Sequence, residues 1–168
     1  MKKLFPVIIL VTLLLAALTP NLFAAAAGDS VCIQSTKYIP PTLPGSRPVV
    51  GVYTFSCTGD STDGSFLAMP FTTSLIQKFM GFYLYKVITN PGATSPTDNW
   101  DFTITDANSI DILGGSGANR HTTTSQMTAP LLTTGVYFAQ PVLGPWTLNI
   151  TGNSVNSATL VIDLVFVK

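Results

Sequence analysis

Short apolar runs alternate with polar and turn residues along most of this chain. In the runs 146–151 and 158–167, every second residue is apolar. Successive side chains of a β-strand point to opposite faces, so this period predicts strands with one face buried in a core. The second face of 158–167 also carries three valines, Val161, Val165 and Val167, which predicts a central strand or one buried at a subunit contact.

The same pattern predicts strands elsewhere in the chain. The predicted strands cover 49–57, 65–71, 82–89, 101–105, 110–113, 135–140, 146–151 and 158–167. The strand 82–89 is apolar on both faces and is predicted to be central, while 101–105 and 110–113 are predicted to form a β-hairpin. The segment 73–80 fits a helical turn as well as a strand. About seven or eight short strands separated by turn signals predict an all-β fold, a single antiparallel β-sandwich or jelly-roll-like domain.

The N-terminal segment differs from the rest of the chain. A basic pair at 2–3 precedes an apolar run over 4–18, and four alanines follow at 24–27. This order is typical of a secretory signal peptide, here cleaved after Ala26 or Ala27. An uncleaved membrane anchor is the alternative, because the segment is long enough to span a bilayer.

A proline-rich stretch separates this segment from the predicted strands. Four prolines lie within 38–48, and each of them fixes φ and removes a backbone donor. We therefore divide the chain into a signal segment at 1–27, an extended Pro-rich arm at 28–48 and a β-sandwich domain at 49–168.

The two cysteines, Cys32 and Cys57, both follow the predicted signal segment. An even number of cysteines in an exported protein predicts a disulfide, because the compartment is oxidising. Two unpaired buried thiols are the alternative. A metal site is not expected, since two cysteines and one histidine cannot complete a zinc shell.

Charged residues are scarce in this sequence. They make up 10% of the chain and their formal net charge is +0, so we expect no nucleic-acid partner. All eight acidic residues are aspartates. The absence of Glu and the scarcity of Lys, beside abundant Thr, Val, Ile and Gly, favour strands over helices.

Two segments match ligand-binding loops only in part. Gly114–Arg120 is rich in glycine, but a phosphate loop needs a helix after it, and residues 121–125 are a poor helix start. Asp106, Asn108 and Asp111 match the first ligands of a calcium loop, but the required glycine and distal Glu are missing. We interpret both segments as structural turns and expect no cofactor and no metal.

Candidate catalytic residues are few. His121 is the only histidine, and no G-x-S-x-G nucleophile motif accompanies it. Asp98, Asp101 and Asp111 could supply paired carboxylates for a hydrolase. Aspartates at strand ends are ordinary turn residues, however, so we predict no catalytic residues and no enzymatic activity.

Three aromatic residues are candidates for a sugar-binding surface. Tyr83, Tyr85 and Trp100 lie in or beside predicted strands, and an exposed aromatic ring could stack against a saccharide. Glycans are therefore the alternative partner.

Residues 81–167 carry three segments that resemble a known group of proteins. The segments are GFYLYKVITNPG, PTDNWDFTITDANSIDILGGSGANR and PVLGPWTLNITGNSVNSATLVIDLVF. They look like small β-rich, mostly uncharacterised structural proteins of tailed phages and prophages. The resemblance implies a virion-associated structural component and supplies no catalytic residues. Among the matching positions, we hypothesise that Asp101, Asp111 and Arg120 form a polar cluster that stabilises the fold.

The sequence predicts a non-enzymatic, exported structural or assembly protein that forms a homo-oligomer or coats a larger phage-like or cell-surface particle. A secreted carbohydrate-binding or adhesin-type module is the alternative. A signal segment and a cysteine pair do not suit a particle assembled in the cytoplasm. The expected location is therefore the periplasm, the cell surface or the exterior, with a virion as a further option. Membrane contact is expected only through 1–27, if that segment is not cleaved.

Overall fold

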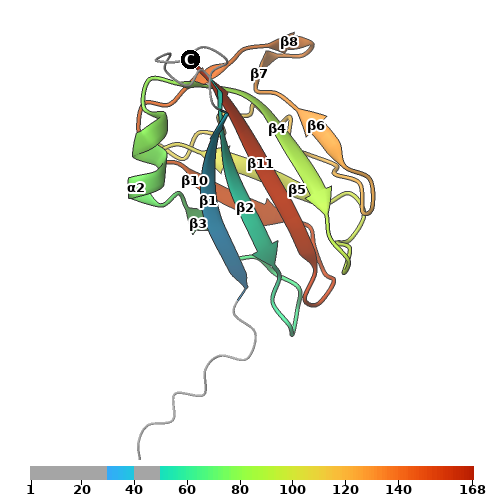
Figure 1. Ribbon diagram of the computed structural model, residues 1–168. Coiled ribbons are helices and arrows are strands. Elements are labelled where there is room, and N and C mark those ends of the chain that lie inside the picture. The colour runs from blue at the N-terminus through green and yellow to red at the C-terminus, as the bar shows by residue number, and fades with distance from the viewer. Residues whose placement is uncertain (1–29, 40–49) are drawn as a thin grey trace, which may run out of the picture.

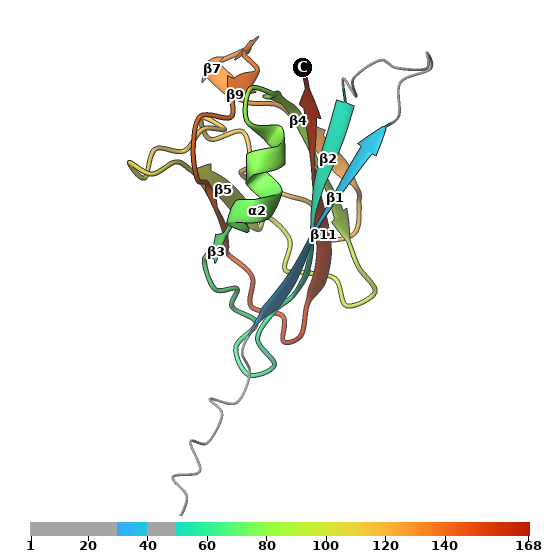
Figure 2. The ribbon, with the colours of Figure 1, turned by 60° about the vertical axis from the view of Figure 1, so that its left-hand side comes forward.

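Antiparallel strands form two sheets that face each other (Figures 1 and 2). The computed structural model describes residues 30–39 and 50–168. The larger sheet has six strands in the order β1–β2–β11–β4–β6, and β9 also pairs with β4. Its strands are β1 (Val31–Ile39), β2 (Val50–Thr58), β4 (Tyr83–Pro91), β6 (Gln126–Thr128), β9 (Gln140–Pro141) and β11 (Thr159–Val167). The predicted all-β sandwich is thus confirmed.

The smaller sheet and the helical segment complete the sandwich. The smaller sheet has three strands, in the order β3 (Met69–Pro70), β10 (Thr147–Thr151) and β5 (Asp101–Thr105). A separate hairpin of β7 (Leu131–Thr133) and β8 (Val136–Tyr137) lies at one end of the molecule (Figure 1). The helical turns α2 (Thr73–Ile76) and η2 (Gln77–Phe79) lie across one open side between the two sheets (Figure 2).

The core lies between the sheets, and β11 supplies its longest buried row. Every second residue of β11 from Leu160 to Phe166 is at most 1% exposed. Full burial of a large apolar side chain stabilises by roughly 1.5–3 kcal/mol. Because β2 and β4 pair with β11 on its two sides, it is the central strand that its apolar faces predicted.

Core packing decides the conformation of the segment that fitted both a helix and a strand. Thr73–Phe79 forms one α-helical turn and then a 3₁₀ turn. Ile76 and Phe79 are both buried, and residues three apart lie on the same side of a helix. The Phe79 ring stacks on that of Phe166, with their centroids 4.5 Å apart.

The first strand lies earlier in the chain than the sequence predicted. We expected an extended arm over 28–48 and a domain that begins at 49, but Val31–Ile39 pairs along its whole length with β2. Its inward face gives no apolar period, because that face carries Cys32, Gln34, Thr36 and Tyr38. Pairing and side-chain bonds fix this strand instead: Tyr38 Oη donates to the Lys78 carbonyl over 2.9 Å.

Three other predicted strands are shorter, or do not form. Residues 110–113 are not a strand, and a single bridge between Thr105 and Asp111 replaces the predicted hairpin. Residues 65–71 contribute only β3, and residues 135–140 divide between β8 and β9. At 110–113 the Asp111 carboxylate accepts hydrogen bonds from the N–H of Ile104 on β5 and from the N–H of Leu113, in the place that a backbone carbonyl of a hairpin strand would take.

Two expectations concern residues that the structure does not describe. The signal segment predicted at 1–27, and the part of the predicted arm at 40–48, lie outside the described residues. Within 30–39 and 50–168, no helix has the length and apolar character needed to cross a membrane.

The predicted disulfide between Cys32 and Cys57 is present and joins directly paired residues of β1 and β2. It closes a loop with a sequence separation of 25. Replacing both cysteines with Ala should lower the free energy of unfolding by about 3–4 kcal/mol, because the unfolded chain gains conformational freedom. Urea unfolding of the oxidised protein, the reduced protein and the double variant measures the loss. Equal unfolding midpoints for the oxidised and reduced proteins would contradict this expectation.

Candidate functional surface

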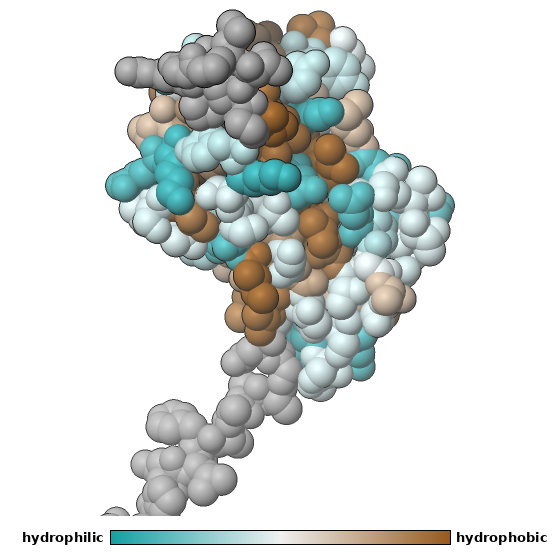
Figure 3. Space-filling view, viewed as in Figure 1, coloured by the Kyte–Doolittle hydropathy of each residue, from teal (hydrophilic) through white to brown (hydrophobic). Residues whose placement is uncertain are grey.

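The outer face of the larger sheet is not covered by any other described element, and much of it is apolar (Figures 1 and 3). A sheet face exposed to water usually carries polar side chains. Here the alternation of β11 places its second row of side chains, which are mostly valines, on this face. We call this surface the open face, and its apolar and aromatic residues are Val31, Ile33, Ile39, Val50, Val52, Tyr83, Ile88, Met127, Val161, Val165 and Val167.

A polar row crosses the middle of the open face. The register places Ser35 beside Thr54, and Thr54 beside Asp163. Thr54 Oγ1 donates to Asp163 Oδ1 over 2.6 Å. The carboxylate is therefore bound within the sheet, and on β11 it lies between two outward valines, Val161 and Val165.

A β-bulge in β4 turns an aromatic side chain away from the regular pattern. The pairing with β11 shifts between Val165 and Phe166, which lie opposite Lys86 and Leu84 and leave Tyr85 as the extra residue. A bulge bends its strand and re-aims a side chain. Tyr85 is 55% exposed as a result.

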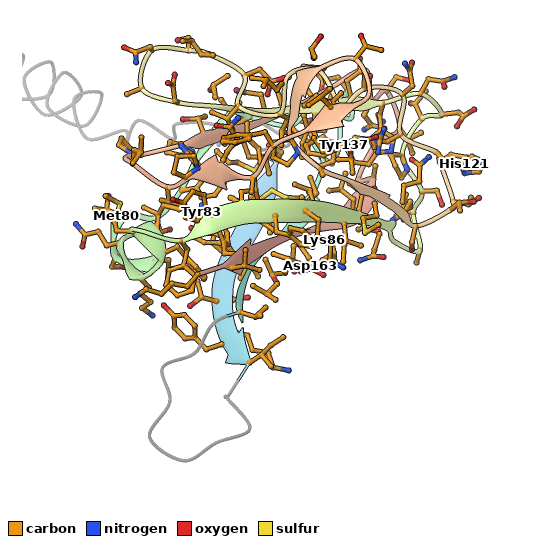
Figure 4. The ribbon with its side chains drawn as sticks, turned by 90° about the horizontal axis from the view of Figure 1, so that it is seen from above. Met80, Tyr83, Lys86, His121, Tyr137 and Asp163 are labelled. Carbon is orange, nitrogen blue, oxygen red and sulfur yellow. A yellow bond between two sulfur atoms is a disulfide. The ribbon has the colours of Figure 1, made fainter. Side chains whose placement is uncertain are left out.

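Tyr85 lines a groove of about 550 Å³ between β4, β6 and the β7–β8 hairpin. Tyr137, Phe138, Met127 and Lys86 line it as well. Figure 4 shows Lys86 on β4 and Tyr137 on the neighbouring hairpin. Aromatic walls with a few polar groups are typical of ligand-binding pockets, so this aromatic groove is the second candidate surface.

Two of the three predicted surface aromatics are exposed, and the third is buried. Tyr83 and Tyr85 are exposed, but Trp100 is 0% exposed and belongs to the core, so its predicted place on a sugar-binding surface is wrong. Trp100 forms a β-bridge with Arg120, and its ring lies 6.0 Å from that of Phe102. The loop over 114–120 lies against Trp100, and the polar neighbours of Trp100 in sequence do not reveal this contact.

Sequence reasoning missed two residues of the aromatic groove, Tyr137 and Phe138. Both are more than half exposed. A signal was present, because neighbouring residues of a strand point to opposite faces. Two adjacent aromatic residues in the predicted strand 135–140 could therefore not both enter one core. In the structure β8 ends at Tyr137, and both rings lie outside the core.

Asp111, one of the three residues of the hypothesised polar cluster, organises the loop after β5. Its Oδ1 accepts hydrogen bonds from the N–H groups of Ile104 (3.3 Å) and Leu113 (3.1 Å). Its Oδ2 accepts one from the N–H of Gly115 (2.8 Å). A carboxylate that binds three backbone donors holds the loop against the strand.

Asp101 and Arg120 hold the other end of the same loop. Asp101 Oδ1 accepts from the N–H of Asn119 over 2.7 Å, and Arg120 Nε and Nη2 donate to the Ala118 carbonyl over 3.0 and 2.7 Å. Burial lowers the pKa of Arg120, and the nearby charge of Asp101 opposes this effect. The three residues surround one loop, and their stabilising effect stays a prediction.

Gly114 and Gly117 allow this loop to lie close to its neighbours. A Cβ at Gly117 would lie 2.0 Å from the Phe102 carbonyl oxygen, and a Cβ at Gly114 would lie 2.3 Å from that of Leu131. The Phe102 N–H donates to the Gly117 carbonyl over 3.1 Å. The glycine-rich segment therefore covers the edge of β5, as a structural loop does.

The remaining candidate residues take part in local turns. Asp98 Oδ1 accepts from the N–H of Thr122 over 3.2 Å, and His121 Nδ1 accepts from the N–H groups of Thr123 and Thr124 over 3.0 Å. In Figure 4, His121 lies at the far end of the molecule from Tyr83. Within the described part of the chain, no group of three or more His, Cys, Asp or Glu side chains could hold a metal ion.

Asp106 closes the turn between β5 and Asp111. Its Oδ1 accepts from the N–H groups of Asn108 (2.8 Å) and Ile110 (3.0 Å). These bonds, led by that from Ile110, lower the pKa of Asp106. The carboxylate is thus engaged by the backbone of its own turn.

No family model and no curated protein matches the chain. A solved structure described as the Cyanophage Pam1 capsid asymmetric unit is similar to it at 18% sequence identity and a TM-score of 0.39. The alignment covers 77% of this chain and 93% of that chain. At this TM-score the likeness is loose, so we base the proposed function on the surface of this chain.

The polar cluster can be tested by removing its members. Asp111→Ala should lower the free energy of unfolding by about 2–3 kcal/mol, because three backbone donors lose a charged acceptor. Arg120→Ala should lower it by about 1–2 kcal/mol through the freed Ala118 carbonyl. Urea unfolding measures both, with Asp98→Ala as the control, since it removes a bond of 3.2 Å at the edge of the loop. Unchanged stability in both variants would refute the cluster hypothesis.

Proposed function

We propose that this protein is a non-enzymatic structural or assembly protein that associates with copies of itself or coats a larger particle. The observation that carries the proposal is the open face, where apolar side chains far outnumber charged ones. Monomeric soluble proteins rarely expose contiguous apolar patches of large size. Association would remove this surface from water.

Two further features support a structural role. Exposed apolar side chains also gather at the β7–β8 hairpin, where Leu132, Val136 and Tyr137 are each 47% exposed or more. The resemblance of residues 81–167 to structural proteins of tailed phages favours the same role.

We also propose that the protein is exported. The disulfide between Cys32 and Cys57 is of a kind that persists in oxidising compartments. The basic pair and apolar run at the N-terminus are typical of a signal peptide. Together they favour assembly outside the cytoplasm, at a cell surface or in a particle completed there.

Self-association can be measured by sedimentation velocity on the purified, non-reduced protein from low to high micromolar concentration. We expect species larger than the monomer, whose share grows with concentration. A Val161→Ser, Val165→Ser double variant should weaken association by roughly tenfold, because each substitution removes apolar area from the contact. Ile110→Ser is the control, since Ile110 is 61% exposed in the turn after β5. A strict monomer at every concentration would refute the proposal.

A secreted carbohydrate-binding or adhesin-type module is the second candidate, and the aromatic groove favours it. Two exposed rings, Tyr85 and Tyr137, approach it from different elements. Apolar faces of sugars stack on aromatic rings while hydroxyl groups bind polar side chains, and Lys86 offers a donor at the same place.

A glycan array followed by fluorescence titration of any hit tests this candidate. Tyr137→Ala should weaken sugar binding roughly two- to tenfold, as loss of a stacking partner does. Tyr83→Ala is the matched control, because Tyr83 is an exposed tyrosine of β4 that does not line the groove. An array without hits, or equal losses in the two variants, would exclude a sugar site here.

A further inference from the structure

The edge strands of the two sheets differ in their length and in whether another segment covers them. On one side the larger sheet ends in the short strands β6 and β9, and the smaller sheet ends in β3, which has 2 residues. The edge of β5 is covered, because the Phe102 N–H donates to the Gly117 carbonyl and the Arg120 N–H donates to the Trp100 carbonyl. Short or covered edges are how native sheets avoid pairing with other chains.

β1 is the exception among the described edges. It is 9 residues long, it ends the strand order of the larger sheet, and no described strand pairs with its far side. An edge of this length presents a row of unpaired N–H and C=O groups, which is a template for another strand.

The register shows which backbone groups of β1 point outward. The Cα atoms of Cys32 and Cys57 are 4.1 Å apart, a spacing typical of an antiparallel pair that does not exchange hydrogen bonds. On the other side of β2, the N–H of Gly59 bonds to the Ala158 carbonyl. Because Gly59 lies two residues after Cys57, the backbone groups of Cys57 also point toward that side and away from β1. The outward groups of β1 are therefore those of Cys32, Gln34, Thr36 and Tyr38.

The β1 edge is also held rigidly. The disulfide fixes one end of the strand, Gln34 Nε2 donates to the Pro70 carbonyl over 2.9 Å, and Tyr38 Oη donates to the Lys78 carbonyl over 2.9 Å. Each of these side chains points inward, so they anchor the strand without blocking its edge. A rigid edge loses little conformational entropy when a partner strand binds.

We propose that β1 pairs in antiparallel fashion with β1 of a second copy of this chain, about a twofold axis at Ser35. The inference rests on the proposed function and adds the β1 edge as a second contact beside the open face. In this register, Cys32 exchanges hydrogen bonds with the partner's Tyr38, and Gln34 with the partner's Thr36. The two larger sheets become one continuous sheet, and the two open faces become one surface.

The outer side chains of β1 favour a second copy as the occupant. The same register sets Val31 beside the partner's Ile39, and Ile33 beside the partner's Lys37. Both pairs occur twice because of the symmetry. No like charges face each other across the axis, and a formal net charge of +0 gives little long-range repulsion between copies.

The sign of a charge at position 33 tests the register. Ile33 is 68% exposed, so substitution there leaves the core intact. Ile33→Lys places a lysine opposite the partner's Lys37 and should weaken the dimer, while Ile33→Glu places an acid there and should tighten it. Two symmetric pairs change together, so each shift in dissociation constant should be roughly two- to thirtyfold. Sedimentation equilibrium at low salt measures both.

A backbone variant tests the edge itself. The N–H of Thr36 faces outward, so Thr36→Pro removes a donor from the edge without removing a bond to β2. It should abolish pairing through β1, and thermal unfolding at low concentration checks that the monomer stays folded. Hydrogen exchange gives an independent measurement: the amides of Gln34, Thr36 and Tyr38 should become protected as concentration rises.

The outcomes separate this inference from the proposed function. Opposite shifts for Ile33→Lys and Ile33→Glu, with concentration-dependent protection of the β1 amides, support edge pairing. Association that is equal in the wild type and all three variants would overturn edge pairing and leave self-assembly standing. A wild-type protein that stays monomeric at every concentration would overturn both.

Discussion

The position of β11 between β2 and β4 is the constraint on which the rest of this structure depends. The side chains of one row, every second residue from Leu160 to Phe166, are at most 1% exposed. The other row forms the middle of the open face. A slip of one residue in either pairing would exchange these rows and place valines in the core. The same register that packs the core therefore also determines which apolar side chains the molecule presents outside.

The sequence predicts those parts of the fold in which a strand has one buried face and one open face. The runs 146–151 and 158–167 alternate clearly, and both are strands close to their predicted bounds. The sequence pattern did not predict β1, because the side chains on its inward face are mostly polar and show no apolar period. A disulfide and hydrogen bonds to residues far along the chain fix its position instead. A local pattern carries no information on such distant partners.

The candidate surfaces show the same limit. The open face follows from the valines of β11, whereas the aromatic groove depends on a bulge at Tyr85 and on a hairpin whose position no local pattern gives. Trp100 illustrates the converse error, since its polar sequence neighbours indicate a surface that the loop over 114–120 in fact covers. That loop fits because Gly114 and Gly117 lack side chains that would collide with neighbouring carbonyl groups.

The strand order also bears on how the chain reaches this structure. β2 pairs with β11, which follows about a hundred residues later, while both are central to the core. A fold built on pairings so distant in sequence has a high contact order, and its assembly is slow. The larger sheet cannot close until β11 is available to pair with both β2 and β4, so its core forms late. For the export that we propose, this delay would keep the chain unfolded while it crosses a membrane.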